Sequence, residues 1–174
     1  TSRFWSERVS RPAVPELSEF VVPLDLGTIA HTFPVYDNWP VTNFSRESNT
    51  LYNNEGNGQF SDQSDYVGLQ EETMLPLGFG TLFFDADNDA DLDLFVANGH
   101  VLDRVAQQDA DLTYRQANQL FLFSEGVFYD ASSVSGSAFH IQEVSRGAAV
   151  GDYDNDGDQD ILVNNGNGPA KLYR

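Results

Sequence analysis

The sequence predicts an all-β fold assembled from a repeating unit of short strands. Three observations support this: short apolar runs rich in β-branched and aromatic residues, turn residues that end each run, and an internal repeat of 67 residues. The repeat relates three pairs of positions: Gly80 and Gly147, Asp85 and Asp152, Asn98 and Asn165. Such units are typical of propeller blades or β-solenoids, in which each unit buries its apolar face only by stacking on a neighbour.

The N-terminal segment, residues 1–40, differs from the rest of the chain. Three of the nine basic residues fall within its first 11 positions, and prolines at 12, 15, 23 and 34 interrupt any long element. Phe20-Val21-Val22 could form one strand. We expect a linker or a divergent repeat here. Tyr36-Asp37-Asn38-Trp39-Pro40 keeps a single carboxylate where later repeats have an acidic loop, so we expect no metal site there.

The first repeat, residues 41–98, ends in a strand, an acidic loop and a second strand. Thr81-Leu82-Phe83-Phe84 precedes the loop, and Leu94-Phe95-Val96-Ala97 follows it before the turn residues Asn98-Gly99. Both runs are short and rich in aromatic and β-branched residues. They predict β-strands rather than helices.

The second repeat, residues 99–165, has the same order of elements. Ala148-Ala149-Val150 and Ile161-Leu162-Val163 flank its acidic loop. Further matches link Asn49-Thr50-Leu51-Tyr52 with Asn118-Gln119-Leu120-Phe121, and Phe60-Ser61-Asp62 with Phe128-Tyr129-Asp130. A polar insertion, Val101 to Gln116, predicts a surface loop or short helix. Residues 166–174 resemble the start of a third repeat.

The two acidic loops, residues 85–93 and 152–160, each carry Asp at positions 1, 3, 5, 7 and 9. They hold ten of the 27 acidic residues. Neighbouring carboxylates repel by about 1 kcal/mol per pair even in water, so a cation is expected to compensate them. Oxygen donors without nearby His or Cys favour Ca²⁺. The alternative is a solvated acidic turn without metal.

An EF-hand is excluded because loop position 12 is Val96 or Val163 instead of glutamate, and the flanks are strands. We expect the side chains at positions 1, 3, 5 and 9 to bind the ion, and the carbonyl of position 7 to add another oxygen. The expected side-chain ligands are Asp85, Asp87, Asp89, Asp93, Asp152, Asp154, Asp156 and Asp160, and the carbonyl ligands are Asp91 and Asp158.

Loop position 6 distinguishes the two loops. This position needs a left-handed backbone, which Gly157 adopts readily in the second loop and Ala90 does not in the first. A Cβ in that conformation costs about 1–2 kcal/mol. The hypothesis is that the first site binds calcium more weakly, or in a distorted loop.

These motifs together resemble the FG-GAP, or VCBS, repeats of integrin-like β-propellers. Phe79-Gly80, the strand, the acidic loop and Leu94-Phe95-Val96 follow that family's order. Leu94 to Val101 and Asn164 to Arg174 are similar to the branch, including cartilage acidic proteins, whose propeller precedes an ASPIC/UnbV module. The resemblance covers about residues 41–174. It implies a partial propeller of about two and a half blades of four-stranded antiparallel sheet. It also implies the ligand set given above.

The sequence departs from the family pattern in three places. The Gly-Ala-Pro end of the founding motif is absent, Arg146-Gly147 replaces Phe-Gly, and the ASPIC/UnbV module is missing. A propeller needs about four to eight blades. We therefore expect a piece of a longer protein, completed by further blades or by self-association through open strand edges.

Composition limits the partners and the compartment. The net charge of −18 argues against nucleic acid and anionic membranes as partners. No stretch has the 18 apolar residues of a membrane-spanning helix. Open calcium sites fill at about 0.1–1 mM in extracellular modules, which favours an extracellular, periplasmic or cell-surface location.

Motifs for an enzyme are absent: the sequence has no His-Glu-x-x-His, no Gly-x-Ser-x-Gly and no Walker loop. The leading interpretation is a non-catalytic, calcium-binding repeat segment that mediates protein or glycan binding and adhesion. One alternative is the structural propeller portion of a secreted enzyme whose active site lies outside this chain. Another is a calcium sensor, which the short strand flanks argue against.

Overall fold

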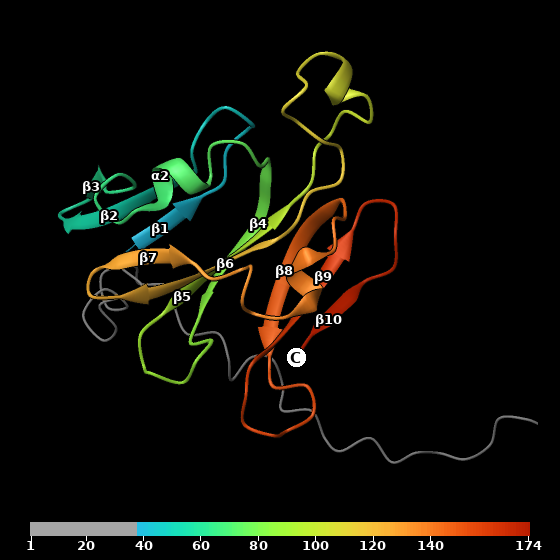
Figure 1. Cartoon of the computed structure of the whole chain (residues 1–174). Helices are drawn as coiled ribbons and strands as arrows, with labels where there is room; N and C mark the ends of the chain where they lie inside the picture. Colours follow the sequence, from blue (N-terminus) through green and yellow to red (C-terminus); the bar gives the residue numbers. More distant parts are fainter. Residues whose placement is uncertain (1–37) are drawn as a thin grey trace, which may run out of the picture. The chain divides into compact units, whose positions relative to one another are not determined.

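The computed structural model describes residues 38–174, which form three antiparallel sheets with little helix (Figure 1). The predicted all-β class is confirmed. The candidate strand Phe20-Val21-Val22 and most of the N-terminal segment lie outside the described residues.

The first sheet contains β1 (Asn38–Val41), β2 (Thr50–Gly56) and β3 (Gln59–Asp62), in that order. The β2–β3 hairpin turns at Asn57 and Gly58, whose φ angles are 54° and 75°. Asn-Gly favours a tight hairpin because both residues tolerate positive φ. The short helix α2 (Leu69–Glu72) follows and buries Leu69.

The second sheet is a four-stranded meander of β4 (Gly78–Phe84), β5 (Asp93–Asn98), β6 (Gln119–Ser124) and β7 (Val127–Asp130). The predicted insertion lies between β5 and β6 and contains one short 3₁₀ helix, η3 (Val105–Gln107). A second 3₁₀ helix, η4 (Ser137–His140), follows β7.

The third sheet contains β8 (Ser145–Gly151), β9 (Asp160–Asn165) and β10 (Lys171–Tyr173), with β9 in the centre. Its register repeats that of the second sheet. Thr81 pairs with Val96 in one sheet, and Ala148 pairs with Val163 in the other. Each pair of strands has an irregularity at its start. The 67-residue spacing in sequence is therefore also a spacing between equivalent strand pairs.

The sheets begin and end at different points from the sequence repeats. Residues 78–130 make one sheet, which crosses the boundary between residues 98 and 99. The unit seen in the sequence thus joins the last strands of one sheet to the first two strands of the next.

A second repeated feature fastens the outer hairpins. The Asp62 carboxylate accepts hydrogen bonds from the Ser64 amide and hydroxyl, and the Ser64 hydroxyl accepts one from the Leu51 amide. Asp130, Ser132 and Leu120 make the same three bonds in the second sheet. The correspondence of Phe60-Ser61-Asp62 with Phe128-Tyr129-Asp130 is thus also a correspondence of contacts.

The second sheet is buried on both faces because the other two sheets stack on it. All six residues of β5 are buried. Leu94 and Val96 join Leu51 and Leu69 in one apolar cluster, whereas Phe95 and Ala97 join Ile161 and Val163 in another. Alternate side chains of a strand point to opposite faces, so one strand contributes to both cores.

The first strands of the second and third sheets approach closely. A Cβ built on Gly80 would lie 2.8 Å from the Cα of Gly147, which is closer than any side chain tolerates. Glycine at position 80 therefore permits the backbones of β4 and β8 to pack directly, whereas a Cβ at Gly147 would meet the Asn164 side chain. Within the described residues, no helix is long and apolar enough to cross a membrane.

Candidate metal centre

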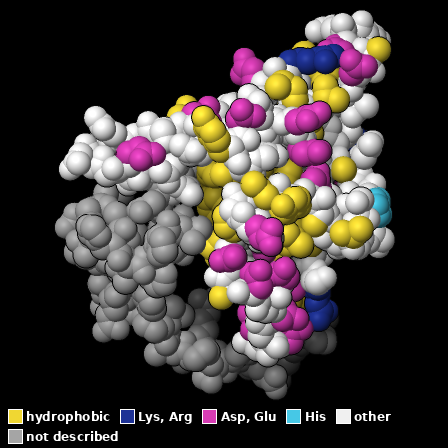
Figure 2. All heavy atoms as spheres, turned by 60° about the vertical axis from the view of Figure 1, so that its left-hand side comes forward, with side chains coloured by type: hydrophobic (Ala, Val, Ile, Leu, Met, Phe, Trp, Pro, Cys, Tyr) yellow, Lys and Arg dark blue, Asp and Glu magenta, His cyan; other side chains and the backbone are white. Residues whose placement is uncertain are grey.

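The acidic loops connect equivalent strands of two stacked sheets. The first joins β4 to β5 and the second joins β8 to β9, and both lie at the lower edge of the sheets in Figure 1. Acidic side chains also gather toward this lower end in Figure 2. Asn88 Nδ2 donates to Asp158 Oδ1 over 3.1 Å, so the two loops touch.

The Asp at position 1 organises each loop by accepting two backbone hydrogen bonds. Asp85 accepts from the amides of Asp89 at 3.1 Å and Ala90 at 3.0 Å. Asp152 accepts from Asp156 and Gly157, both at 3.2 Å. These bonds curl the chain so that positions 3 and 5 come back towards position 1.

Positions 4 and 6 give the chain the curvature that this requires. In the first loop, Asn88 and Ala90 have φ angles of 62° and 74°. In the second, Asn155 and Gly157 have φ angles of 60° and 98°. The predicted left-handed backbone at position 6 is thus present in both loops. Ala90 adopts it despite its Cβ, and its loop keeps the hydrogen bonds of the glycine-containing loop.

The Asp at position 9 closes each loop from inside the protein. Asp93 is 1% exposed and Asp160 is 5% exposed. Asp93 Oδ2 accepts from the Ala86 amide at 2.8 Å, and Asp160 Oδ2 accepts from the Tyr153 amide at the same distance. Asp93 Oδ1 also accepts from Phe123 on β6, so the first loop is fastened to a third strand.

Burial raises the pKa of Asp93 above its usual value, and the neighbouring Asp87 and Asp89 carboxylates raise it further. The hydrogen bonds from the Phe123 and Ala86 amides act in the opposite direction. A nearby cation would favour the ionised form and so oppose the effect of burial.

Three carboxylates converge in each loop. Oxygens of Asp85, Asp87 and Asp89 lie within 4.8 Å of one another, and those of Asp152, Asp154 and Asp156 do the same. Each group could hold one metal ion. These are six of the eight predicted side-chain ligands. The other two, Asp93 and Asp160, are not among these groups; they are buried, and their oxygens accept hydrogen bonds from backbone amides.

The two residues at position 7 are placed by hydrogen bonds to position 5. The Asp91 amide donates to Asp89 Oδ1 at 2.9 Å, and the Asp158 amide donates to Asp156 Oδ1 at 3.0 Å. Their predicted role as carbonyl ligands stays a prediction.

Arg174 is a functional candidate that sequence reasoning missed. Its guanidinium pairs with Asp154 at loop position 3. In the repeat, Arg174 corresponds to Leu122, which is apolar. The pair brings a fixed positive charge to one loop only. Its position at the end of β10, within reach of the loop, depends on how β10 pairs with β9.

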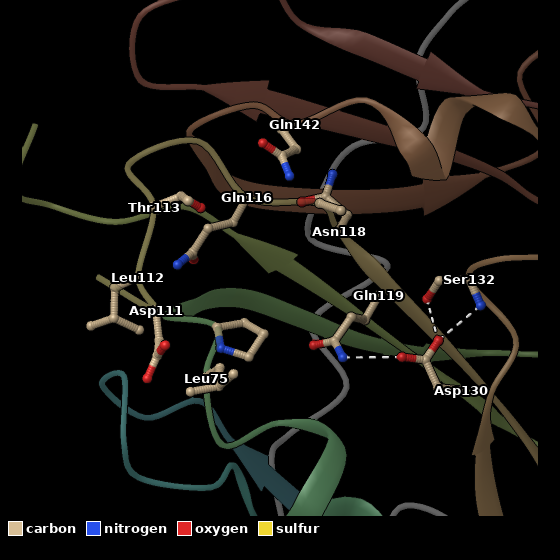
Figure 3. Close-up of a pocket in the computed structure, with 12 residues that line it drawn as sticks. Leu75, Asp111, Leu112, Thr113, Gln116, Asn118, Gln119, Asp130, Ser132 and Gln142 are labelled. Carbon is tan, nitrogen blue, oxygen red and sulfur yellow. Dashed lines mark hydrogen bonds between the residues drawn. The ribbon is translucent and has the colours of Figure 1, made fainter. Parts of the chain in front are cut away.

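At the other end of the sheets, a cavity of about 300 Å³ is lined by a different set of groups (Figure 3). Four of its twelve lining residues carry amide side chains, and Leu75, Pro76 and Leu112 form an apolar edge. Gln119 Nε2 donates to Asp130 Oδ2, which fixes both side chains. The lining amides are Gln116, Asn118, Gln119 and Gln142.

His100 lies at this end, buried at 1% exposure. Its Nδ1 accepts from the Leu102 amide, and its ring packs edge-on against Phe44. Burial lowers the pKa of His100, which favours the neutral ring. Arg146, which replaces an expected Phe, donates to the carbonyls of Gly99 and His100 and covers the Phe79 ring at 4.1 Å.

Comparison with family models and with curated proteins gives no relative from which a function could be transferred. No family model matches the chain, and no curated protein matches it either.

Proposed function

We propose that residues 38–174 are a calcium-binding, non-catalytic segment of a β-propeller that mediates adhesion outside the cell. The observation that carries the proposal is the repetition of one loop structure. Three carboxylates converge in the same way in both loops, and in both the carboxylate at position 1 accepts the same two backbone hydrogen bonds.

Calcium fits the donors better than other common metals. Ca²⁺ takes six to eight oxygen ligands in flexible geometry, whereas Mg²⁺ demands a tight octahedron and Zn²⁺ prefers nitrogen or sulfur. Each loop offers three exposed or half-buried carboxylates, and its surface position leaves room for water ligands. An ionised carboxylate has lone pairs beyond its backbone hydrogen bonds, so Asp93 and Asp160 can still contribute oxygens.

A propeller accounts for the way in which the sheets stack. The second sheet has four antiparallel strands, as a blade does, and its first strand approaches the first strand of the third sheet at Gly80 and Gly147. Blades pack face to face with their first strands nearest the central axis. The apolar clusters on both faces of β5 support this arrangement.

The proposed role follows from the division between the two ends. Calcium would neutralise the loops at one end and rigidify the hairpins that carry the sheets. The amide-lined cavity and the insertion at the other end offer hydrogen-bonding groups suited to a protein or glycan surface. A calcium ion also holds carboxylates ionised, which makes them poor general acids and favours binding over catalysis.

Calorimetric titration with Ca²⁺ and thermal melting test the proposal. Wild type should bind two calcium ions and melt at a higher temperature in calcium than in chelator, because the ion binds only the folded state. Asp85→Asn with Asp87→Asn should remove one site, and Asp154→Asn with Asp156→Asn the other. A titration with Mg²⁺ should show much weaker binding.

The matched control is Asp65→Asn with Asp103→Asn, two exposed acidic residues outside the loops that lose the same charge. This variant should retain both sites. The proposal fails if wild type shows no calcium-dependent shift, or if the control loses binding as the loop variants do.

A further inference from the structure

The outward faces of the first and third sheets are apolar, and each matches a face that the second sheet buries. Four side chains of the second sheet match the outward face of the first sheet. They face the first sheet and are at most 7% exposed. They are Leu94, Val96, Phe121 and Phe128.

The first sheet presents the equivalent four positions to solvent. Register fixes the equivalence: Trp39 pairs with Tyr52 as Leu94 pairs with Phe121. The exposed fractions are 65% for Trp39, 37% for Val41, 39% for Tyr52 and 50% for Phe60. Together these four line an apolar recess of about 240 Å³, here named the front face.

The third sheet presents a complementary set, here named the rear face and made of Ala149, Leu162 and Leu172. Leu162 is 51% exposed and Leu172 is 39% exposed, and all three line a recess of about 470 Å³. Their equivalents in the second sheet pack against the third sheet. These equivalents are Leu82, Phe95 and Leu120.

The second sheet therefore shows what covers such faces. A surface equivalent to the front face packs on a surface equivalent to the rear face. This occurs twice inside the molecule, where the first sheet meets the second and the second meets the third. Among residues 38–174, the two outer faces are the uncovered halves of the same interface. Burying rows of large apolar side chains is favourable at about 25 cal/mol per Å².

We infer that the front face of one molecule stacks on the rear face of a second copy of this chain. The two surfaces are unlike, so the contact is head-to-tail and either closes into a ring or extends. A second copy is the occupant that the packing between sheets favours. Its rear face has the same apolar positions as the surface of the second sheet that packs on the third sheet. The net charge of −18 opposes association, and salt should strengthen it by screening.

Analytical ultracentrifugation of the full chain across micromolar to millimolar concentrations tests the inference. Wild type should associate in a concentration-dependent way. Tyr52→Lys on the front face and Leu162→Lys on the rear face should each raise the Kd at least about tenfold. Both side chains are exposed, so neither change disturbs the core.

Mixing the two variants gives the decisive result. The front variant keeps its rear face and the rear variant keeps its front face, so an equimolar mixture should form a heterodimer that neither variant forms alone. Tyr66→Lys and Val134→Lys, at 78% and 82% exposure outside both faces, are controls that should associate like wild type.

Three outcomes overturn the inference. One is a wild type that stays monomeric, which is also the result if another segment of the same chain covers the front face. The second is a mixture that stays monomeric. The third is association that the controls weaken as much as the face variants do.

Discussion

The two acidic loops have one internal structure in different surroundings. Both place three carboxylates together, both accept amides at position 1 and both use left-handed residues at positions 4 and 6. The first loop has Ala90 at position 6, and its Asp93 accepts a hydrogen bond from Phe123, whose counterpart in the repeat would follow Arg174. The second has Gly157 and an ion pair between Asp154 and Arg174.

This comparison separates the contacts that form the loop from those that change its stability and charge. The shared hydrogen bonds suffice to bring the carboxylates together, since they are the same whether position 6 is Ala or Gly. The differences act on stability and charge. The first loop is strained at Ala90, whereas the second is relaxed at Gly157 and is partly neutralised by the Arg174 guanidinium.

The largest difference in stability between variants of the two loops is expected from replacing the Asp at position 9 by alanine. Asp93→Ala leaves the amides of Ala86 and Phe123 without their acceptor, whereas Asp160→Ala does so for the Tyr153 amide. An unsatisfied buried donor costs about 1–3 kcal/mol. We expect losses of about 2–4 kcal/mol for Asp93→Ala and about 1–3 kcal/mol for Asp160→Ala, measured by denaturant unfolding in chelator.

The exposed Asp91→Ala is the control for this pair and should change stability by less than about 0.5 kcal/mol. Equal losses for Asp93→Ala and Asp160→Ala would mean that the bond to Phe123 contributes nothing. The first loop would then not be the more firmly fastened of the two.

A smaller effect is expected from exchanging the residues at position 6. Ala90→Gly relieves the strain of a positive φ and should stabilise the protein by about 0.5–1 kcal/mol. The gain is smaller than the strain because glycine loses more conformational entropy on folding than alanine does. Gly157→Ala should destabilise it by about 1–2 kcal/mol. No atom lies within 4 Å of a Cβ built at Gly157, so the cost is conformational.

Urea unfolding of both variants measures this exchange, and calorimetry extends it to calcium. The expected wild-type result is a weaker first site, as predicted from Ala90. Equal calcium affinities at both sites would contradict that prediction, and a stabilising Gly157→Ala would contradict the strain argument.

The smallest effect is expected from Arg174→Leu. This change places leucine beside the second loop, as Leu122 stands at the equivalent position of the second sheet. Charges about 4 Å apart interact by about 1 kcal/mol in water. Calcium should therefore bind the second loop up to about fivefold more tightly at low salt, with the gain fading as salt is added.

Arg115→Leu serves as the control because it removes the same charge from an ion pair with Glu143, away from both loops. A gain of equal size in this variant would assign the effect to net charge rather than to the contact with Asp154. Calorimetry at two salt concentrations distinguishes these results.

The sequence predicted the features that depend on neighbours along the chain. Runs such as Thr81–Phe84 and Ile161–Val163 are strands because short apolar runs next to turn residues favour them. Position 6 was predicted to be left-handed because the loop must curl within a few residues. The converging carboxylates follow from the same local spacing.

The remaining contacts depend on how sheets stack and pair, which local patterns do not determine. The bond from Phe123 to Asp93 joins residues 30 positions apart, and that from Asn88 to Asp158 joins residues 70 positions apart. The boundaries of the sheets were also not visible. A repeat has the same length wherever counting begins, so its period does not show which strands pair.

The bond between Asp93 and β6 also affects how the protein would resist pulling. A hairpin fastened only at its turn can be peeled away from the sheet one ladder bond at a time. The Asp93 carboxylate on β5 accepts hydrogen bonds from the Ala86 amide in its own loop and from the Phe123 amide on β6. Force applied to β4 is therefore shared across β4, β5 and β6. Such load sharing would suit an adhesive protein under tension.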